Sequence, residues 1–344
     1  MKNIMTPVLF VCALLLFNQC QKTTFITKNK ELLFVSNEDA GMVTIIDPNT
    51  LLILDTIPVG KRTRGMKVGP KGELLYVATS GSPKCPPWIT EEECEKKKVD
   101  KSADGIAVID IKKRKVIRVL PSGSDPEQFD ISKDGNYIYI SNEDVDMASV
   151  LDIKKGIIEK EIPVGAEPEG VRLSPDNKWC YVTAESDHTI TVINTSSNKA
   201  VASINVGLRP RDIIFNASGS LAYVTGEADG SLSIIDTKSK KVIDHIKLRE
   251  GSMPVGLVLS PDEKIIYIAN GRGKGIIKLN LKTSKSEYLL IGKRPWGIVM
   301  STNGEKIYLA DAPSNAVFVV DVLTFKVQDS IKVAKGPWGL VLRN

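Results

Sequence analysis

A short apolar pattern recurs seven times along the chain. Each copy has an apolar residue, then Tyr or Phe, then an aliphatic residue, and most copies follow the preceding one by about 42 residues. The copies centre on Phe34, Tyr76, Tyr139, Tyr181, Tyr223, Tyr267 and Tyr308. Short apolar runs bounded by polar and turn-forming residues predict β-strands, and a fixed long period predicts a repeat fold.

Each copy continues in the same way. A polar loop leads to an apolar strand that ends in Asp or Asn, and a turn leads to another apolar strand. The strand-ending residues are Asp47, Asp110, Asp152, Asn194, Asp236, Asn280 and Asp321. A loop rich in Gly and Pro, a fourth strand and a turn such as Ser174-Pro175-Asp176 complete the unit. Four short strands per repeat are typical of one propeller blade, so the sequence predicts an all-β protein.

The two ends of the repeat region complement each other. The chain enters at the second strand of a blade, Glu31 to Ser36, and finishes on a first strand, Trp338 to Arg343. The last strand can therefore complete the first blade, and this pairing removes the exposed sheet edges of an open array. We expect residues 31–344 to form a single seven-bladed β-propeller of four-stranded blades, closed by the C-terminal strand pairing into the N-terminal blade. Length alone would favour two domains, but repeat folds grow by adding units.

The first residues differ from the rest. Lys2 precedes an apolar stretch from Ile4 to Phe17, which is too short to span a bilayer comfortably and is typical of a signal-peptide core. A cysteine at the end of such a stretch is where bacterial lipoproteins are cleaved and acylated. We predict a signal peptide over 1–19, lipidation of Cys20, and a tether over 20–30. The alternative is ordinary secretion with cleavage elsewhere, since Gln19 replaces the usual small residue.

Export places the chain in an oxidising compartment, which bears on its other cysteines. Cys85 and Cys94 lie in one long loop and are predicted to form a disulfide. A metal pair is the weaker alternative, because their spacing matches no zinc motif. Cys180 lies in an apolar strand and is expected to be a buried thiol.

Charge argues against nucleic acid as a partner. The net charge is +5, from 46 basic and 41 acidic residues spread along the chain. Nucleic-acid binders usually concentrate basic residues on one face or in a run. The expected partners are a protein or a small anionic ligand in the cell envelope, with a lipid anchor in a membrane, and we expect a monomer.

The repeats also carry a family resemblance. Tyr181-Val182-Thr183, Tyr223-Val224-Thr225 and Arg294-Pro295-Trp296-Gly297 resemble the bacterial and archaeal YVTN-repeat propellers. Strings such as Ser36-Asn37-Glu38-Asp39-Ala40 and Gly123-Ser124-Asp125-Pro126 are similar to a subgroup associated with catabolism that depends on pyrroloquinoline quinone (PQQ). The resemblance implies a periplasmic setting and a link to PQQ, and it implies no particular reaction.

The loops between blades carry the candidate site. Strand alternation places them on one face together with the loops between second and third strands. Before the recurrent Pro, or the Thr63 that replaces it, stand Arg62, Asp125, Glu167, Arg209, Met253, Arg294 and Gly336. After it stand Arg64, Glu127, Glu169, Arg211, Val255, Trp296 and Trp338, where the inner strands begin. These two rows, here called the channel mouth, are expected to surround the central channel. The position after them is mostly Gly, as close approach requires, whereas Gln128 and Asp212 are expected to intrude into the channel.

The loops between second and third strands add charge and a long insertion. Glu38, Glu143, Glu185 and Glu227 form an acidic collar in four of these loops. The insertion, 80–104, belongs to the same loop class in the second blade, and we interpret it as a flap over the channel mouth. Long loops in compact domains are more often functional or disordered than idle.

Several kinds of chemistry remain open at this face. Arg62, Arg64, Arg209, Arg211 and Arg294 could hold an anionic ligand while Trp296 and Trp338 stack on its ring, and PQQ fits that description. The collar suggests Ca²⁺ instead. The structural alternatives are salt bridges that orient the inner strands and tryptophans that plug the channel.

Catalytic groups are sparse. The chain has two histidines, His188 in a loop of this face and His245 in an outer strand, and no nucleophile–base pair or haem-attachment motif is evident. The leading hypothesis is a non-catalytic binding or scaffolding protein of the cell envelope. The alternatives are an accessory or PQQ-binding protein in PQQ-linked oxidation, and a Ca²⁺-dependent hydrolase of the lactonase type.

Overall fold

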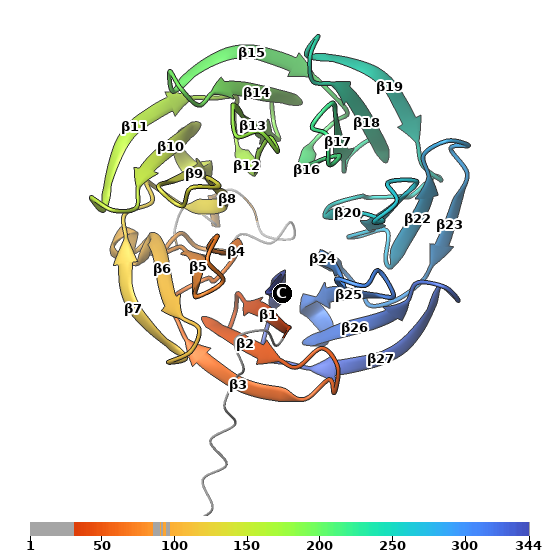
Figure 1. The fold of residues 1–344 in the computed structure, drawn as a ribbon, viewed down its shortest axis with the longest axis horizontal. Coiled ribbons are helices and arrows are strands. Elements are labelled where there is room, and N and C mark those ends of the chain that lie inside the picture. The colour runs from red at the N-terminus through yellow and green to blue at the C-terminus, as the bar shows by residue number, and fades with distance from the viewer. Residues whose placement is uncertain (1–30, 85–89, 91, 94–96, 344) are drawn as a thin grey trace, which may run out of the picture. The chain divides into compact units, whose positions relative to one another are not determined.

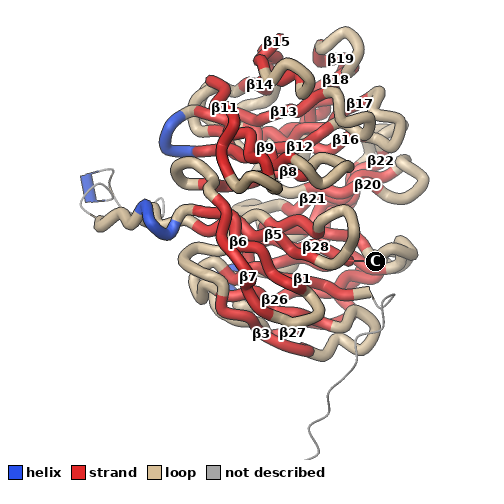
Figure 2. Tube along the Cα trace, turned by 60° about the vertical axis from the view of Figure 1, so that its left-hand side comes forward, coloured by secondary structure: helices blue, strands red, loops and turns tan. Residues whose placement is uncertain are grey.

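The computed structural model describes residues 31–84, 90, 92, 93 and 97–343. The predicted signal peptide, Cys20, the tether, Cys85 and Cys94 lie outside the described residues. Within them, no helix is long and apolar enough to cross a membrane. In the described part of the chain, helical structure is confined to residues 92–93 and three short 3₁₀ turns, and the other described residues form strands or loops (Figure 2). The 3₁₀ turns are η1 (Lys101–Ala103), η2 (Glu143–Val145) and η3 (Ala312–Ser314).

The described residues form seven antiparallel four-stranded sheets arranged in a ring, which confirms the predicted seven-bladed propeller (Figure 1). Blade 1 contains β28 (Pro337–Arg343), β1 (Leu32–Asn37), β2 (Met42–Ile46) and β3 (Ile53–Pro58). Blades 2 and 3 contain β4 (Met66–Val68), β5 (Leu74–Thr79), β6 (Gly105–Asp110) and β7 (Lys115–Leu120), then β8 (Pro126–Ile131), β9 (Tyr137–Asn142), β10 (Met147–Asp152) and β11 (Ile157–Pro163). Blades 4 and 5 contain β12 (Pro168–Leu173), β13 (Trp179–Ala184), β14 (Thr189–Asn194) and β15 (Lys199–Asn205), then β16 (Pro210–Phe215), β17 (Leu221–Gly226), β18 (Ser231–Asp236) and β19 (Lys241–Lys247). Blades 6 and 7 contain β20 (Leu257–Leu259), β21 (Ile265–Ala269), β22 (Ile276–Asn280) and β23 (Ser286–Leu289), then β24 (Pro295–Met300), β25 (Lys306–Asp311), β26 (Ala316–Asp321) and β27 (Lys326–Lys332).

The ring closes where the sequence predicts. β28 pairs antiparallel with β1, and Leu33 lies opposite Leu342 while Val35 lies opposite Leu340. Blade 1 thus takes its inner strand from the C-terminus and its other three strands from the beginning of the ring. Every blade therefore has all four of its strands, and the ring has no incomplete sheet with an open edge.

The recurrent aromatic position holds neighbouring blades together. Tyr181 of blade 4 is fully buried and meets Phe215 of blade 5 edge-on, with ring centroids 5.0 Å apart. The hydroxyl of Tyr308 in blade 7 donates a hydrogen bond to the carbonyl of Pro48 in blade 1, over 3.2 Å. A ring that packs between sheets and a hydroxyl that reaches the next blade explain why Tyr suits this position.

Turn chemistry explains the recurrent Asp and Asn. The Asp152 carboxylate accepts a hydrogen bond from the Lys155 backbone N–H at 2.7 Å, and Asn194 holds Ser197 in the same way at 3.0 Å. A side chain that accepts from the backbone a few residues later closes the turn between the third and fourth strands. These turns and the Ser-Pro-Asp turns are structural, so the chemical variation lies on the other face.

Candidate functional site

The channel mouth is built by backbone that turns sharply just before each inner strand. The residue before the recurrent Pro has a left-handed conformation at Arg62, Asp125, Glu167 and Arg209, with φ between 42° and 57°. Such a conformation is unfavourable for residues other than Gly, Asn and Asp, by roughly 1 kcal/mol or more. The turn brings side chains of two successive rows over the channel, and charges from neighbouring blades meet there.

Arg64 is the centre of one charge cluster. Its side chain is 1% exposed and forms ion pairs with Asp125 and Glu127, with Glu143 at 3.6 Å. Its Nη2 also donates to the carbonyl of Pro126 at 2.9 Å. Three carboxylates around one buried guanidinium neutralise it, so Arg64 is not free to hold an anionic ligand.

Arg211 is the centre of a second, similar cluster on the next pair of blades. It forms ion pairs with Glu169 and Glu185, and its Nε donates to Glu227 at 2.6 Å. Arg209 lies further out and contacts Glu185 at 2.6 Å. The predicted basic and acidic sectors therefore meet as two arginine-centred clusters, and the collar residues Glu185 and Glu227 take part in one of them.

Burial shapes the proton affinities in both clusters. Burial raises the pKa of Glu143 to about 7 against the attraction of Arg64, and it also raises the pKa of Glu169 in spite of Arg211. Burial alone would lower the pKa of Arg211, but Glu169 and Glu227 raise it overall. At neutral pH, the Glu143 carboxyl group is therefore partly protonated, whereas the Arg211 guanidinium stays charged.

Among the described residues, Arg272 and Arg294 have fewer carboxylate partners than the arginines of the two clusters. Arg294 forms no ion pair among the described residues, and its Nε is buried without a hydrogen-bond partner there. The Nε of Arg272 is likewise without a hydrogen bond, with Glu227 3.8 Å away. Burial and the nearby Arg272 lower the pKa of Arg294. Two neighbouring cations with unused donors are thus present at the channel mouth, and buried donors in folded proteins normally have partners.

The two tryptophans pack on each other and on arginine. Their ring centroids lie 6.0 Å apart, and Trp338 is 8% exposed. The guanidinium carbons of Arg211 and Arg294 lie 5.1 and 5.2 Å from the centroid of the Trp296 ring. Contacts of this kind are cation–π interactions. Because the rings contact each other, they leave no slot for a planar ligand between them.

The acidic collar pairs with basic side chains instead of converging on one point. Glu38 contacts Arg62 at 3.1 Å and Lys84 at 2.8 Å, and their charges lower its pKa although burial alone would raise it. Among the described residues, no group of three or more His, Cys, Asp or Glu side chains is arranged to hold a metal ion. The collar therefore does not fit a Ca²⁺ site, which needs several carboxylate oxygens around one ion.

The base of the 80–104 insertion is anchored to the loops of blades 1 and 3. Lys84 contacts Glu38 and Asp39 of blade 1, both at 2.8 Å. Lys101 donates to Ser124 at 2.7 Å, before blade 3, and contacts Asp144. The described ends of the insertion thus lie beside the Arg64 cluster, on the face that the sequence predicts.

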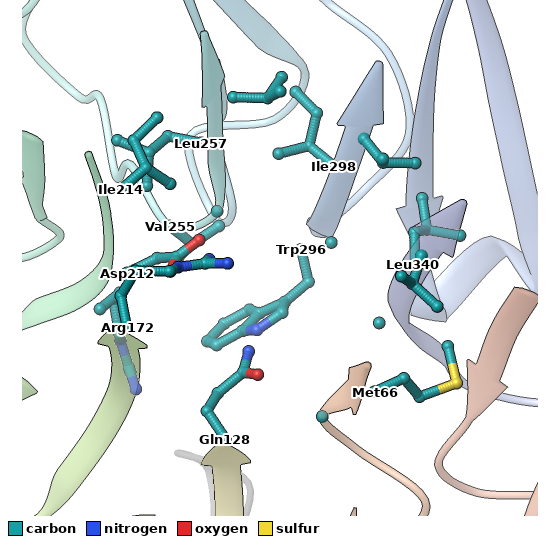
Figure 3. Close-up of a pocket in the computed structure, with 18 of the residues that line it drawn as sticks. Met66, Gln128, Arg172, Asp212, Ile214, Val255, Leu257, Trp296, Ile298 and Leu340 are labelled. Carbon is teal, nitrogen blue, oxygen red and sulfur yellow. The ribbon is translucent and has the colours of Figure 1, made fainter. Parts of the chain in front are cut away.

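A cavity of about 530 Å³ lies along the central channel. Trp296 projects over it, with Gln128 and Asp212 among the lining residues (Figure 3). The intrusion predicted for Gln128 and Asp212 is confirmed. The glycines of the same row allow the inner strands to approach closely, since a Cβ at Gly297 would lie 2.4 Å from the carbonyl oxygen of Trp338.

Sequence reasoning missed two parts of this site. Gly271-Arg272 stands in the loop position that holds Glu38-Asp39 in blade 1. The alignment that identified the acidic collar therefore also shows a basic residue, Arg272, at a position that is acidic in other blades. The missed cavity residues are Lys67 and Arg172, which lie within the inner strands and not at their first residues. They occupy the position that Val258 occupies in blade 6, opposite the recurrent Tyr of the second strand. Charge at an otherwise aliphatic position was the available signal.

Comparison with known proteins gives likenesses of fold. A scan against protein-family models finds no match, and no curated protein matches the sequence. Among solved structures, a periplasmic gluconolactonase from Pseudomonas aeruginosa has a TM-score of 0.72 at 17% identity, covering 91% of this chain and 99% of that one. A protein from Bacteroides uniformis provisionally described as a 6-phosphogluconolactonase has a TM-score of 0.74 at 17% identity, over 91% and 99%. Hydrazine synthase from Kuenenia stuttgartiensis has a TM-score of 0.69 at 20% identity, over 80% and 88%. These likenesses establish the fold alone.

Proposed function

We propose that this protein is a non-catalytic binding protein of the cell envelope that holds a small anionic ligand at its channel mouth. The observation that carries the proposal is the arginine pair of Arg272 and Arg294. Each guanidinium has a buried Nε without a hydrogen bond. Among the described residues Arg272 has only Glu227 within ion-pair distance, at 3.8 Å, and Arg294 has no carboxylate there, whereas Arg64 and Arg211 contact three carboxylates each. The proposed location in the cell envelope rests on the signal peptide and the lipidated Cys20 that the sequence predicts.

Physical chemistry favours an oxyanion at this pair. Arginine carries donors in a planar fork that matches carboxylate and phosphate, and charge-assisted hydrogen bonds of this kind are among the strongest in proteins. Two guanidiniums held near each other repel, and a bound anion would relieve that repulsion. Trp296, in contact with the Arg294 guanidinium, supplies an apolar surface beside the anion.

PQQ fits this proposal in one respect only. Its carboxylates match the arginine pair, but Trp296 and Trp338 are not placed to enclose its ring system. We therefore use PQQ as one probe of the site and derive no reaction from it.

Calorimetric titration of residues 21–344 with citrate and with PQQ tests the proposal. We expect saturable binding of at least one of them, weakened tenfold or more by Arg294→Gln and by Arg272→Gln, because each substitution removes one charged fork. The matched control is Arg249→Gln, since Arg249 stacks on Tyr288 at 4.0 Å outside the channel. Absence of binding by both probes, or equal binding by all variants, would refute the anion site.

A second candidate function is hydrolysis of a lactone. Glu143, at the edge of the Arg64 cluster, has a pKa near the working pH of most enzymes, which suits a general base that takes a proton from water. The attacking water oxygen would add to the lactone carbonyl, and the ring oxygen would leave as a hydroxyl after taking up a proton. The lactonase-type proteins that share the fold make this substrate class worth testing.

Continuous assay of glucono-1,5-lactone and its 6-phosphate at pH 7.5 separates the two candidates. Under the binding hypothesis, the purified protein leaves the spontaneous rate unchanged. Enzyme-dependent hydrolysis that Glu143→Gln abolishes and Asp144→Asn preserves would favour the second candidate.

A further inference from the structure

The channel cavity extends away from the channel mouth. Its lining runs from Glu169, Arg211, Trp296 and Trp338 at the start of the inner strands to Pro175, which belongs to a turn of the opposite face. Most of its lining residues lie further along the inner strands than Trp296 and Trp338, on the side away from the channel mouth. The volume of about 530 Å³ is within the range of pockets that bind small molecules.

The cavity has two chemically different sides. Lys67, Gln128, Arg172 and Asp212 form a polar side that comes from blades 2 to 5. The apolar side continues around the ring from blade 5 to blade 1 (Figure 3). It contains Ile214, Leu257, Val258, Ile298, Val299 and Val341. An amphipathic cavity of this kind is suited to a ligand with one polar end and one apolar body.

The polar side has more hydrogen-bond donors than there are acceptors paired with them. The Lys67 ammonium has one acceptor among the described residues, Asp130 at 3.3 Å. Arg172 uses Nε on the carbonyl of Ile213 at 3.0 Å and Nη2 on Asp212 at 3.4 Å, which leaves its other N–H groups available. The second oxygen of Asp130 accepts from the Leu173 backbone at 3.0 Å, so this carboxylate is fixed behind Lys67.

Gln128 strengthens the case for a ligand. Glycine occupies the equivalent position in five of the seven blades, whereas Gln128 projects its amide into the cavity toward Trp296 (Figure 3). Gln128 is partly buried, and the hydrogen bonds that it forms with described residues are made by its backbone, to the Ser141 hydroxyl, which leaves the amide available. Burial and the charge of Arg172 also lower the pKa of Lys67, so the two cations act on each other across the cavity. Salt bridges alone would explain Lys67 and Arg172, but they leave Gln128 without a role.

We propose that this cavity binds an amphipathic monocarboxylic acid. The carboxylate lies between Lys67, Arg172 and the Gln128 amide, and the hydrocarbon body lies against the apolar side. The site is distinct from the arginine pair at the channel mouth and does not depend on the function proposed for it.

Calorimetric titration of residues 21–344 with octanoate, 1-octanol and octylammonium tests the ligand class. We expect octanoate to bind at least tenfold more tightly than 1-octanol, and octylammonium to bind more weakly still. Equal affinity for octanoate and octanol would refute the role of the polar side, and failure of octanoate to bind would refute the site.

Two variants locate the binding. Gln128→Leu removes an amide that makes no hydrogen bond, so the fold is expected to persist while octanoate affinity falls several-fold. Val341→Trp fills the apolar side and is expected to abolish binding, with the exposed Val201→Trp on β15 as its control. Thermal melting confirms that each variant is folded. Arg249→Gln, which changes an arginine outside the channel, leaves octanoate affinity within about twofold. A loss of octanoate affinity in Arg294→Gln as large as that in Gln128→Leu would instead assign octanoate to the channel mouth and overturn the proposal.

Discussion

Replacement of Arg211 by methionine is expected to be the most destabilising single change at the channel mouth. Methionine keeps much of the apolar stem and removes the charge. Arg211 contacts three buried carboxylates from three different loops or strands, those of Glu169, Glu185 and Glu227. Its loss leaves these carboxylates with partial compensation from Arg209 at Glu185 and Glu227, and from Arg272 at Glu227, among the described residues.

The expected magnitude follows from two estimates. Removing one partner of a buried ion pair costs about 3–5 kcal/mol. Independently, a stranded carboxylate can take up a proton, which from an unperturbed pKa near 4.3 costs about 3.7 kcal/mol at pH 7. Both estimates give a loss of about 3–5 kcal/mol at pH 7, against a typical domain stability of about 5–15 kcal/mol.

The second estimate also fixes the pH dependence. A stranded carboxylate has a folded-state pKa above its unfolded value, so the variant loses stability as pH rises above the unfolded pKa and regains it as pH falls. At pH 5 protonation costs only about 1 kcal/mol per group, and the deficit is expected to shrink to about 1–2 kcal/mol.

Urea unfolding at pH 5 and pH 7, followed by circular dichroism, measures both quantities. The control is Arg209→Met, because Arg209 is 39% exposed and its ion pairs are expected to contribute at most about 1 kcal/mol. A loss below about 1 kcal/mol for Arg211→Met, or a loss that does not depend on pH, would show that the cluster does not hold the inner strands together as described.

Three further predictions concern the ring, the Arg64 cluster and the insertion. Deletion of 338–344 removes the strand that closes blade 1, so we expect the variant to be unfolded and to show no cooperative transition in a thermal melt, whereas a native-like melt would refute closure by β28. Glu143→Gln removes a carboxylate that is costly to ionise, so the variant should gain about 1–2 kcal/mol at pH 8 and little at pH 5; an equal gain at both pH values would contradict the raised pKa of Glu143. Peptide mapping without reductant should find Cys85 linked to Cys94, and free thiols at both positions would contradict the disulfide.

The fold was predictable because its determinants are local and repeated. The aromatic centre of each second strand, the Asp or Asn that ends each third strand and the Pro at or shortly before the start of every inner strand except that of blade 2, where Thr63 stands, recur in register, so one blade explains the others. Closure followed from the incomplete first and last repeats. Strand alternation then placed the channel mouth and the insertion on one face without knowledge of any contact.

The partners of each charge were not predictable in the same way. Alignment placed Arg64 and Arg211 at equivalent positions, but which carboxylates reach them depends on side chains from neighbouring blades and from separate loops, such as Glu143 and Glu185. The structure gives both arginines carboxylate partners and, among the residues it describes, gives Arg294 none. That distinction depends on distances of a few ångströms between blades, which no repeat pattern encodes.

The most direct test of the account is to locate an anion at the channel mouth. Crystals of residues 21–344 soaked in selenate would reveal this tetrahedral dianion by anomalous scattering from selenium. We predict a peak within hydrogen-bond distance of the guanidiniums of Arg272 and Arg294, and its loss in Arg294→Gln. Selenate found only at surface lysines, with the arginine pair unoccupied, would contradict the claim that this pair is an anion site.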